Sequence, residues 1–179
     1  MFDDIILYVG LEQTAAVVAF ARKMGAADLL LVFLKHDKKN REIAAELKVE
    51  CGLLVKNTKE AQKYAGAYDH LLGLAVRELI EDKKTNLIYG AEDVEGKDKT
   101  HHRLGLNQVL GKLLAERGKT YIFDVSLLLR GDAALVLGRM QHNRKVLKKY
   151  DVKNIACSMA TEWHGVRGKR ERELLLEGL

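Results

Sequence analysis

TYIFDVS (residues 120–126) opens the stretch that decides how this chain folds, and its β-branched and aromatic residues predict a buried strand. Residues 132–150 have the apolar spacing of a long helix, and NIACS (residues 154–158) is expected to form the next strand. A polar loop, residues 159–168, follows it. Strand, helix and strand in this order predict a parallel α/β unit. In such proteins the functional residues gather in the loops after the strands.

The predicted helix 132–150 has two unlike faces. One face is apolar and would pack on a core; it carries Val136, Met140, Leu147 and Tyr150. The other face is cationic; it carries Arg139, His142, Lys145 and Lys149, with Arg144 and Lys148 beside them. We therefore expect the helix to offer a basic side to an acidic partner.

Apolar runs alternate with amphipathic segments along the rest of the chain. The expected strands are residues 4–9, 29–34, 52–55, 70–74 and 87–89, and the expected helices are residues 11–24, 39–47, 59–67, 76–82, 102–116 and 169–176. Residues 90–100 are expected to be a loop. Seven strands in strict alternation with helices predict a parallel sheet, and the even composition favours a closed barrel over an open doubly wound sheet. We expect one domain, residues 1–179, and an irregular closure, because barrels of this kind usually need about 200 residues.

The composition points to a globular protein, with 47% hydrophobic and 31% charged residues. No apolar run reaches the roughly 20 residues that cross a bilayer, and residues 1–4 do not resemble the start of a signal peptide, so we expect a cytoplasmic protein. Cys51 and Cys157 are expected to be buried, reduced thiols.

The net charge of +5 is unevenly distributed. Residues 1–96 hold 13 Lys and Arg against 16 Asp and Glu, whereas residues 97–179 hold 17 against 9. An acidic partner for the second half, with nucleic acid first, and a merely solvated basic surface explain this asymmetry equally well.

Basic residues gather in two predicted loops. The first group is Lys97, Lys99, His101, His102 and Arg103; the second is Arg167, Lys169, Arg170 and Arg172. If both loops follow strands, the two groups share one end of the barrel and could neutralise phosphates. The alternative is that Lys169, Arg170 and Arg172 pair with Glu171, Glu173 and Glu177 along an exposed helix. Trp163 could stack on a base or cover the barrel mouth, and we favour the second interpretation.

Motifs of known enzyme classes are absent from the sequence. It holds no phosphate-binding P-loop, no nucleophile elbow of the serine hydrolases and no dinucleotide fingerprint. The six histidines lack the spacing of a metal-ligand set. A metal-dependent phosphoesterase would need a degenerate site built from Asp37, Glu92, Asp124 and one or two histidines.

Four segments in order carry a resemblance to a known family: GLNQVL (residues 105–110), FDVSLLL (123–129), NRKVLKKYDV (143–152) and SMATEWHGVRG (158–168). Together they resemble archaeal ribonuclease P protein component 3, a relative of the eukaryotic 30-kilodalton ribonuclease P subunit. The resemblance covers about the last ninety residues well, and the first half only by its strand-helix rhythm. It implies an irregular seven-stranded α/β barrel, TIM-like and related to the polymerase and histidinol phosphatase superfamily.

The resemblance also implies a function. Such proteins are non-catalytic subunits of ribonuclease P, an endoribonuclease that removes the 5′ leader from precursor tRNA and whose RNA subunit carries the Mg²⁺-dependent catalysis. The implied partners are ribonuclease P RNA, precursor tRNA, ribonuclease P protein component 2 and other ribonuclease P proteins; no cofactor is expected on this chain. The implied RNA-binding residues are His101 or His102, Arg103, Arg139 and Arg167. Two departures are Lys169, where the family usually has proline, and the end of the sequence at Leu179, where the family continues into a hydrophobic helix.

Three hypotheses follow. The first is a non-catalytic RNA-binding subunit of ribonuclease P, which explains the basic second half and the four matched segments. The second is a metal-dependent phosphoesterase of the related barrel superfamily. The third is a protein-interaction module whose basic surface meets an acidic partner chain.

Overall fold

A computed structural model describes residues 2–93, 105–130 and 132–179. The strands are β1 (Asp4–Leu7), β2 (Leu29–Phe33), β3 (Glu50–Val55), β4 (His70–Leu74), β5 (Leu87–Tyr89), β6 (Thr120–Asp124) and β7 (Asn154–Cys157). The α-helices are α1 (Leu11–Lys23), α2 (Asn40–Glu46), α3 (Thr58–Tyr64), α4 (Arg77–Glu81), α5 (Gln108–Glu116), α6 (Leu127–Arg130), α7 (Ala133–Lys149) and α8 (Lys169–Gly178), and a 3₁₀ turn, η1, spans Trp163–Gly165. Within the described ranges, no helix is long and apolar enough to cross a membrane.

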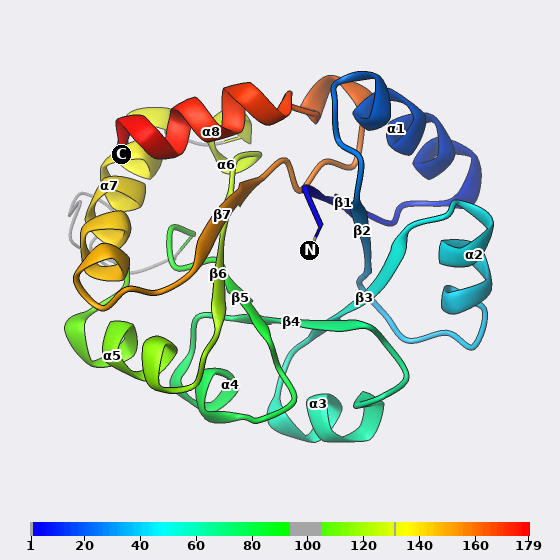
Figure 1. Ribbon diagram of the computed structural model, residues 1–179. Helices are drawn as coiled ribbons and strands as arrows, with labels where there is room; N and C mark the ends of the chain where they lie inside the picture. Colours follow the sequence, from blue (N-terminus) through cyan, green and yellow to red (C-terminus); the bar gives the residue numbers. More distant parts are fainter. Residues whose placement is uncertain (1, 94–104, 131) are drawn as a thin grey trace.

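The strands form one parallel sheet in chain order, β1 to β7, and curl into a ring with helices on the outside (Figure 1). The ring closes irregularly. β7 ends at Cys157, and the chain beyond it meets β1 through a single bridge between Ile6 and Ala160, in which the amide of Leu7 donates to the carbonyl of Ala160 over 3.0 Å. The predicted seven-stranded, TIM-like barrel with an irregular closure is therefore confirmed.

The barrel interior is filled by side chains. Alternate positions of the strands point inwards and form one apolar cluster; it contains Ile5, Leu30, Val32, Leu72, Leu87, Ile122 and Cys157. The N-terminus lies inside the ring (Figure 1), where Phe2 joins this cluster and packs edge-on against His70. A second cluster lies between the sheet and the surrounding helices and includes Phe33, Leu79 and Tyr121. Residues of both faces are removed from water, as a parallel sheet covered on both sides requires.

Several predicted boundaries need correction. The helix expected at residues 102–116 begins at Gln108, because Asn107 caps it by accepting a hydrogen bond from the Leu110 amide over 2.9 Å; residues 102–104 lie outside the described part. Residues 125–126, predicted to be strand, instead lead into helix α6, which the sequence reading missed together with η1. Gly118 follows α5 with φ 60°, as expected of a residue that ends a helix.

Candidate functional site

A pocket of about 370 Å³ lies where β6 and β7 end, among the loops that follow them. Its lining includes Arg130 from α6 and Arg167 from the loop before α8, together with Ser126, Thr161 and His164. Two arginines, two hydroxyls, an imidazole and the carboxylate of Glu162 thus border one hollow at the carboxyl end of the barrel strands, which is the end where such barrels carry their sites. Both guanidinium groups could receive an anionic group such as a phosphate.

The Asp124 side chain anchors one wall of this pocket. Its carboxylate accepts hydrogen bonds from the backbone amide of Ser126, over 2.8 Å, and from the Ser126 hydroxyl. Arg130 pairs with its other oxygen over 3.3 Å while keeping 61% of its own side chain exposed. Burial raises the pKa of Asp124, and the bonds from Ser126 and the charge of Arg130 oppose that rise. The guanidinium of Arg130 is therefore held by Asp124, while most of the Arg130 side chain stays accessible to solvent.

Arg167 is fixed through its backbone. Its amide donates to the hydroxyl of Ser158 over 2.9 Å, and its guanidinium donates to the carbonyls of His164 and Val166 over 2.9 and 3.0 Å. These bonds fold the loop back on itself and keep the half-buried Arg167 side chain beside the pocket. They satisfy one nitrogen of the guanidinium, so other donors of the fork remain for a ligand.

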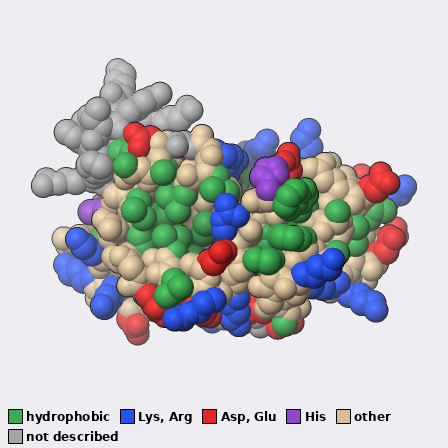
Figure 2. All heavy atoms as spheres, turned by 90° about the horizontal axis from the view of Figure 1, so that it is seen from above, with side chains coloured by type: hydrophobic (Ala, Val, Ile, Leu, Met, Phe, Trp, Pro, Cys, Tyr) green, Lys and Arg blue, Asp and Glu red, His purple; other side chains and the backbone are tan. Residues whose placement is uncertain are grey.

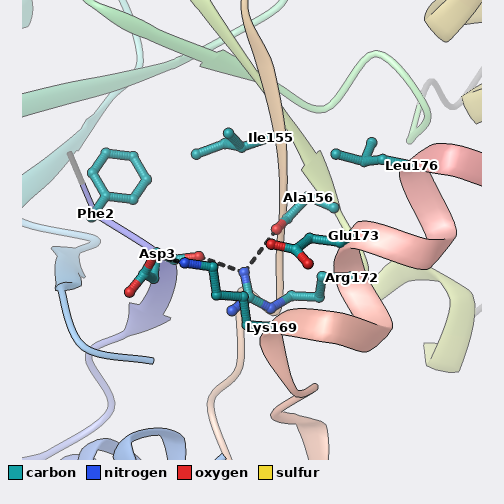
Figure 3. A pocket seen from close by; sticks show the side chains of 8 residues that line it. All are labelled: Phe2, Asp3, Ile155, Ala156, Lys169, Arg172, Glu173 and Leu176. Carbon is teal, nitrogen blue, oxygen red and sulfur yellow. Dashed lines mark hydrogen bonds and ion pairs between the residues drawn. The ribbon is translucent and has the colours of Figure 1, made fainter. Parts of the chain in front are cut away.

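A buried ion pair supports this loop from below. Asp4, which is fully buried, accepts hydrogen bonds from the amide and hydroxyl of Ser158 over 2.6 and 2.7 Å and lies 3.6 Å from Arg172. Arg172 also donates to the carbonyls of Asp3, Ala156 and Arg167; Figure 3 shows it reaching from α8 towards Asp3 and Ala156. This cluster ties α8 to both edges of the sheet, so the prediction of an exposed basic Arg172 is wrong.

The other cations of α8 have acidic partners on the surface. Lys169 pairs with Asp3 over 2.9 Å, an interaction that lowers the pKa of Asp3 and raises that of Lys169. Arg170 lies 3.8 Å from Glu173 and 3.5 Å from Glu177. The alternative of ion pairs along an exposed helix therefore holds for Arg170, whereas Lys169 pairs across to the N-terminus instead.

Trp163 packs on the outer helix α1, so the interpretation that it covers the barrel mouth is wrong. Its side chain is 59% exposed and packs edge-on against Phe20 of α1, with ring centroids 5.7 Å apart. His164 follows it and pairs with Glu162 over 3.1 Å. Figure 2 shows the side of the barrel with α1 and α8, where basic side chains are spread among apolar areas instead of forming one continuous patch. Trp163 therefore does not line the pocket itself but borders a neighbouring hollow, which shares His164 and Arg167 with it.

Arg139 is buried instead of lying on an exposed cationic face of α7. It is 5% exposed, and its guanidinium donates to the carbonyl of Glu92 over 2.7 Å. The buried stripe of α7 has helical spacing and includes polar members: Val136, Arg139, Met140, Asn143, Val146 and Leu147. Half-buried His142 lies 3.0 Å from the Leu106 carbonyl, and only the lysines of the predicted basic face are exposed. An Arg at a core position of a helix cannot be distinguished from a surface Arg by spacing alone.

Glu92 forms the centre of a buried polar cluster behind α7. One carboxylate oxygen accepts hydrogen bonds from the hydroxyl of Tyr121 and the amide of Asn143, both over 2.8 Å. Burial raises the pKa of Glu92 to about 7. Asn143 in turn accepts from the amide of Leu106 over 2.7 Å. The cluster thereby binds Glu92, which follows β5, to Leu106, which precedes α5.

The carboxylates proposed for a phosphoesterase each have other partners. Asp37 accepts from the amide of Lys39 over 2.8 Å, Glu92 belongs to the buried cluster, and Asp124 binds Ser126 and Arg130. Among the residues that the structure describes, no group of three His, Cys, Asp or Glu side chains could hold a metal ion.

The first basic group of the sequence, which consists of Lys97, Lys99, His101, His102 and Arg103, lies outside the described residues, so its place on the barrel stays a prediction. The structure brings Arg167 to the pocket and adds Arg130, which the sequence reading missed. Arg130 ends the short helix α6, and no sequence motif marks it, so its place at the pocket follows from the structure.

Comparison with protein families and with curated proteins finds no match. Among solved structures, the fold is similar to a chain in a cryo-EM structure of archaeal ribonuclease P with mature tRNA. The TM-score is 0.77 at 18% sequence identity, and the match covers 98% of this chain and 81% of the other. Nearly the whole barrel therefore has a counterpart of the same fold.

Proposed function

We propose that this chain is a protein subunit of a ribonuclease P, the ribonucleoprotein that removes the 5′ leader from precursor tRNA. The observation that carries the proposal is the match of nearly the entire fold to a chain of archaeal ribonuclease P. The four segments of the second half that resemble component 3 of that enzyme support it independently, because they were identified from residues and not from the fold.

The role that we propose is to bind and support the catalytic RNA. The pocket between Arg130 and Arg167 is suited to a phosphate of the RNA backbone, and the exposed Trp163 ring beside it could stack on a base. The buried carboxylates of Asp4, Glu92 and Asp124 are engaged in hydrogen bonds within the protein, which favours a binding role over a catalytic one.

The partners that we propose are ribonuclease P RNA, precursor tRNA and ribonuclease P protein component 2. Lys169 and Arg170 remain candidates for RNA contact, although an RNA phosphate would have to compete there with Asp3, Glu173 and Glu177. Arg139 could act on RNA only indirectly, through the buried cluster that it helps to form.

Reconstitution tests the proposal. The RNA subunit, component 2 and this chain are combined, and precursor-tRNA cleavage is followed as Mg²⁺ is lowered. We expect the complete set to cleave at a Mg²⁺ concentration at which the same set without this chain is inactive, and the purified chain alone to leave the substrate intact. Metal-dependent cleavage by the chain alone, together with stoichiometric Mn²⁺ binding in calorimetry, would instead favour the phosphoesterase.

A further inference from the structure

A second group of basic residues follows β2, beside α2 and α3, which lie across the ring of strands from α6 (Figure 1). The loop after β2 reads LKHDKK (residues 34–39), and its lysines, Lys35, Lys38 and Lys39, are exposed. The Oδ1 atom of Asp37 accepts a hydrogen bond from the amide of Lys39 over 2.8 Å, and its negative charge offsets one of the three lysines, which leaves the loop with a net charge of +2. The overall acidic charge of the first half of the sequence had hidden this local excess of positive charge.

An exposed histidine in this loop is held flat against a tyrosine. The rings of His36 and Tyr64 are stacked, with centroids 4.3 Å apart and an interplanar angle of 29°. His36 Nδ1 lies 2.8 Å from the hydroxyl of buried Tyr68. Asn40, which is only 4% exposed, donates to that hydroxyl over 2.9 Å and also to the carbonyl of Lys35 over 2.9 Å. Two buried side chains thus fix the orientation of a ring that solvent can reach.

A further cation borders the stacked pair. Lys63 lies with its Nζ 5.1 Å from the centroid of the Tyr64 ring. We call this group the His36 platform: His36 and Tyr64 form the stacked pair, Lys63 borders the Tyr64 ring, and the exposed Lys35, Lys38 and Lys39 lie within three residues of His36 in the chain. Proteins that bind single-stranded nucleic acid combine flat aromatic rings with cations, because the bases stack on the rings and the phosphates pair with the cations.

We propose that the His36 platform binds an unpaired stretch of RNA, with a base on the exposed part of the His36 ring and the adjacent phosphates at the lysines. The choice of RNA as the ligand rests on the proposed function. An acidic protein segment would also pair with the lysines, but it would gain nothing from a fixed flat ring. The contribution of the His36 ring therefore separates the two ligands.

The test measures binding of the full chain to a short labelled oligouridylate by fluorescence anisotropy over a series of salt concentrations. We expect K38E/K39E to weaken binding about tenfold or more and to reduce the slope of log affinity against log salt by about 1.4, which corresponds to two phosphate contacts on a single strand. The matched control is K83E/K84E, which makes the same change of charge at two exposed lysines before β5. Its affinity for the oligouridylate should equal that of the wild type.

The ring is tested separately from the charge. His36→Ala should weaken binding about fivefold or more, whereas His36→Phe, which keeps a flat ring, should restore most of the affinity. Thermal melting checks that each variant is folded, and the K38E/K39E pair carries the test alone if the His36 variants unfold.

Three results would overturn the inference: an equal loss in K83E/K84E, full affinity in both His36→Ala and K38E/K39E, or binding of an acidic peptide in preference to the oligouridylate. If the platform variants bind the oligouridylate normally while Arg167→Ala reduces reconstituted cleavage, the RNA-binding role of the His36 platform is refuted and the proposed function stands. If the platform binds RNA as expected but the chain adds nothing to reconstituted ribonuclease P, the proposed function fails and the platform stands.

Discussion

Replacing Arg172 by methionine should destabilise the barrel strongly, because it leaves a buried carboxylate without a counter-charge. Asp4 is fully buried and Arg172 is 4% exposed, with 3.6 Å between them. Removing one partner of such a pair costs about 3–5 kcal/mol. For a domain of this size each kcal/mol lowers the melting temperature by about 2–4 °C, so we expect a fall of about 6–20 °C.

Urea unfolding at neutral pH measures this cost, with Arg170→Met as the matched control. Arg170 lies on the same helix but pairs, among the described residues, with the exposed Glu173 and Glu177, so its loss should cost about 0–1 kcal/mol. Asp4→Asn combined with Arg172→Met should recover part of the stability, since the unpaired charge is then gone.

The pH dependence gives the sign of the effect. Burial already raises the pKa of Asp4 above the ordinary value of an aspartate, against the opposing charge of Arg172. In Arg172→Met that pKa rises further. The loss of unfolding free energy in Arg172→Met, relative to the wild type, should therefore be largest at neutral pH. It should shrink as the pH falls, because the Asp4 carboxyl then becomes protonated in both the folded and the unfolded chain. A deficit below about 1 kcal/mol at neutral pH, or one that grows towards acid, would refute the reasoning.

Three further predictions use the same structure. As the pH rises from about 4.5 to 7, the free energy of unfolding should fall by about 3 kcal/mol more in the wild type than in Glu92→Gln. The reason is that Glu92 keeps its proton in the folded chain and releases it in the unfolded chain. Urea titrations at several pH values measure the difference. Arg167→Ala should reduce reconstituted cleavage while changing the free energy of unfolding by less than about 1 kcal/mol, and a large drop in melting temperature would instead mark a structural residue. Gly111→Ala should lower the free energy of unfolding by about 1–3 kcal/mol, despite the better helix propensity of alanine, because its Cβ would lie 2.5 Å from Val146; an unchanged urea midpoint would contradict this.

The sequence predicted the strands and the barrel well for a simple physical reason. A strand such as β2, buried on both faces, must be apolar at every position, and that pattern is local. The order of the strands follows from their strict alternation with helices. The irregular closure was predicted from the chain length, but the bridge between Ile6 and Ala160 joins residues at opposite ends of the sequence, so no local pattern could locate it.

The polar interior was the part that the sequence could not give. Arginine is usually a surface residue, so the sequence gives no sign that Arg172 and Arg139 are buried. Arg172 is buried against Asp4, and Arg139 is buried against the carbonyl of Glu92. Both partners are distant in the chain. The same holds for His36, whose surroundings come from α2, α3 and the segment before β4. Arg167 was found from sequence because its loop carries the resemblance, whereas Arg130 required the geometry of the pocket.

The most direct test of the central claim is to purify the tagged chain from its natural host under native conditions and assay the eluate for precursor-tRNA cleavage. We expect 5′-leader removal to co-purify with the chain and to disappear after treatment with micrococcal nuclease, because the proposed function assigns the catalysis to an RNA subunit. An eluate that is inactive although the chain is intact, or an activity that survives destruction of all RNA, would contradict the account.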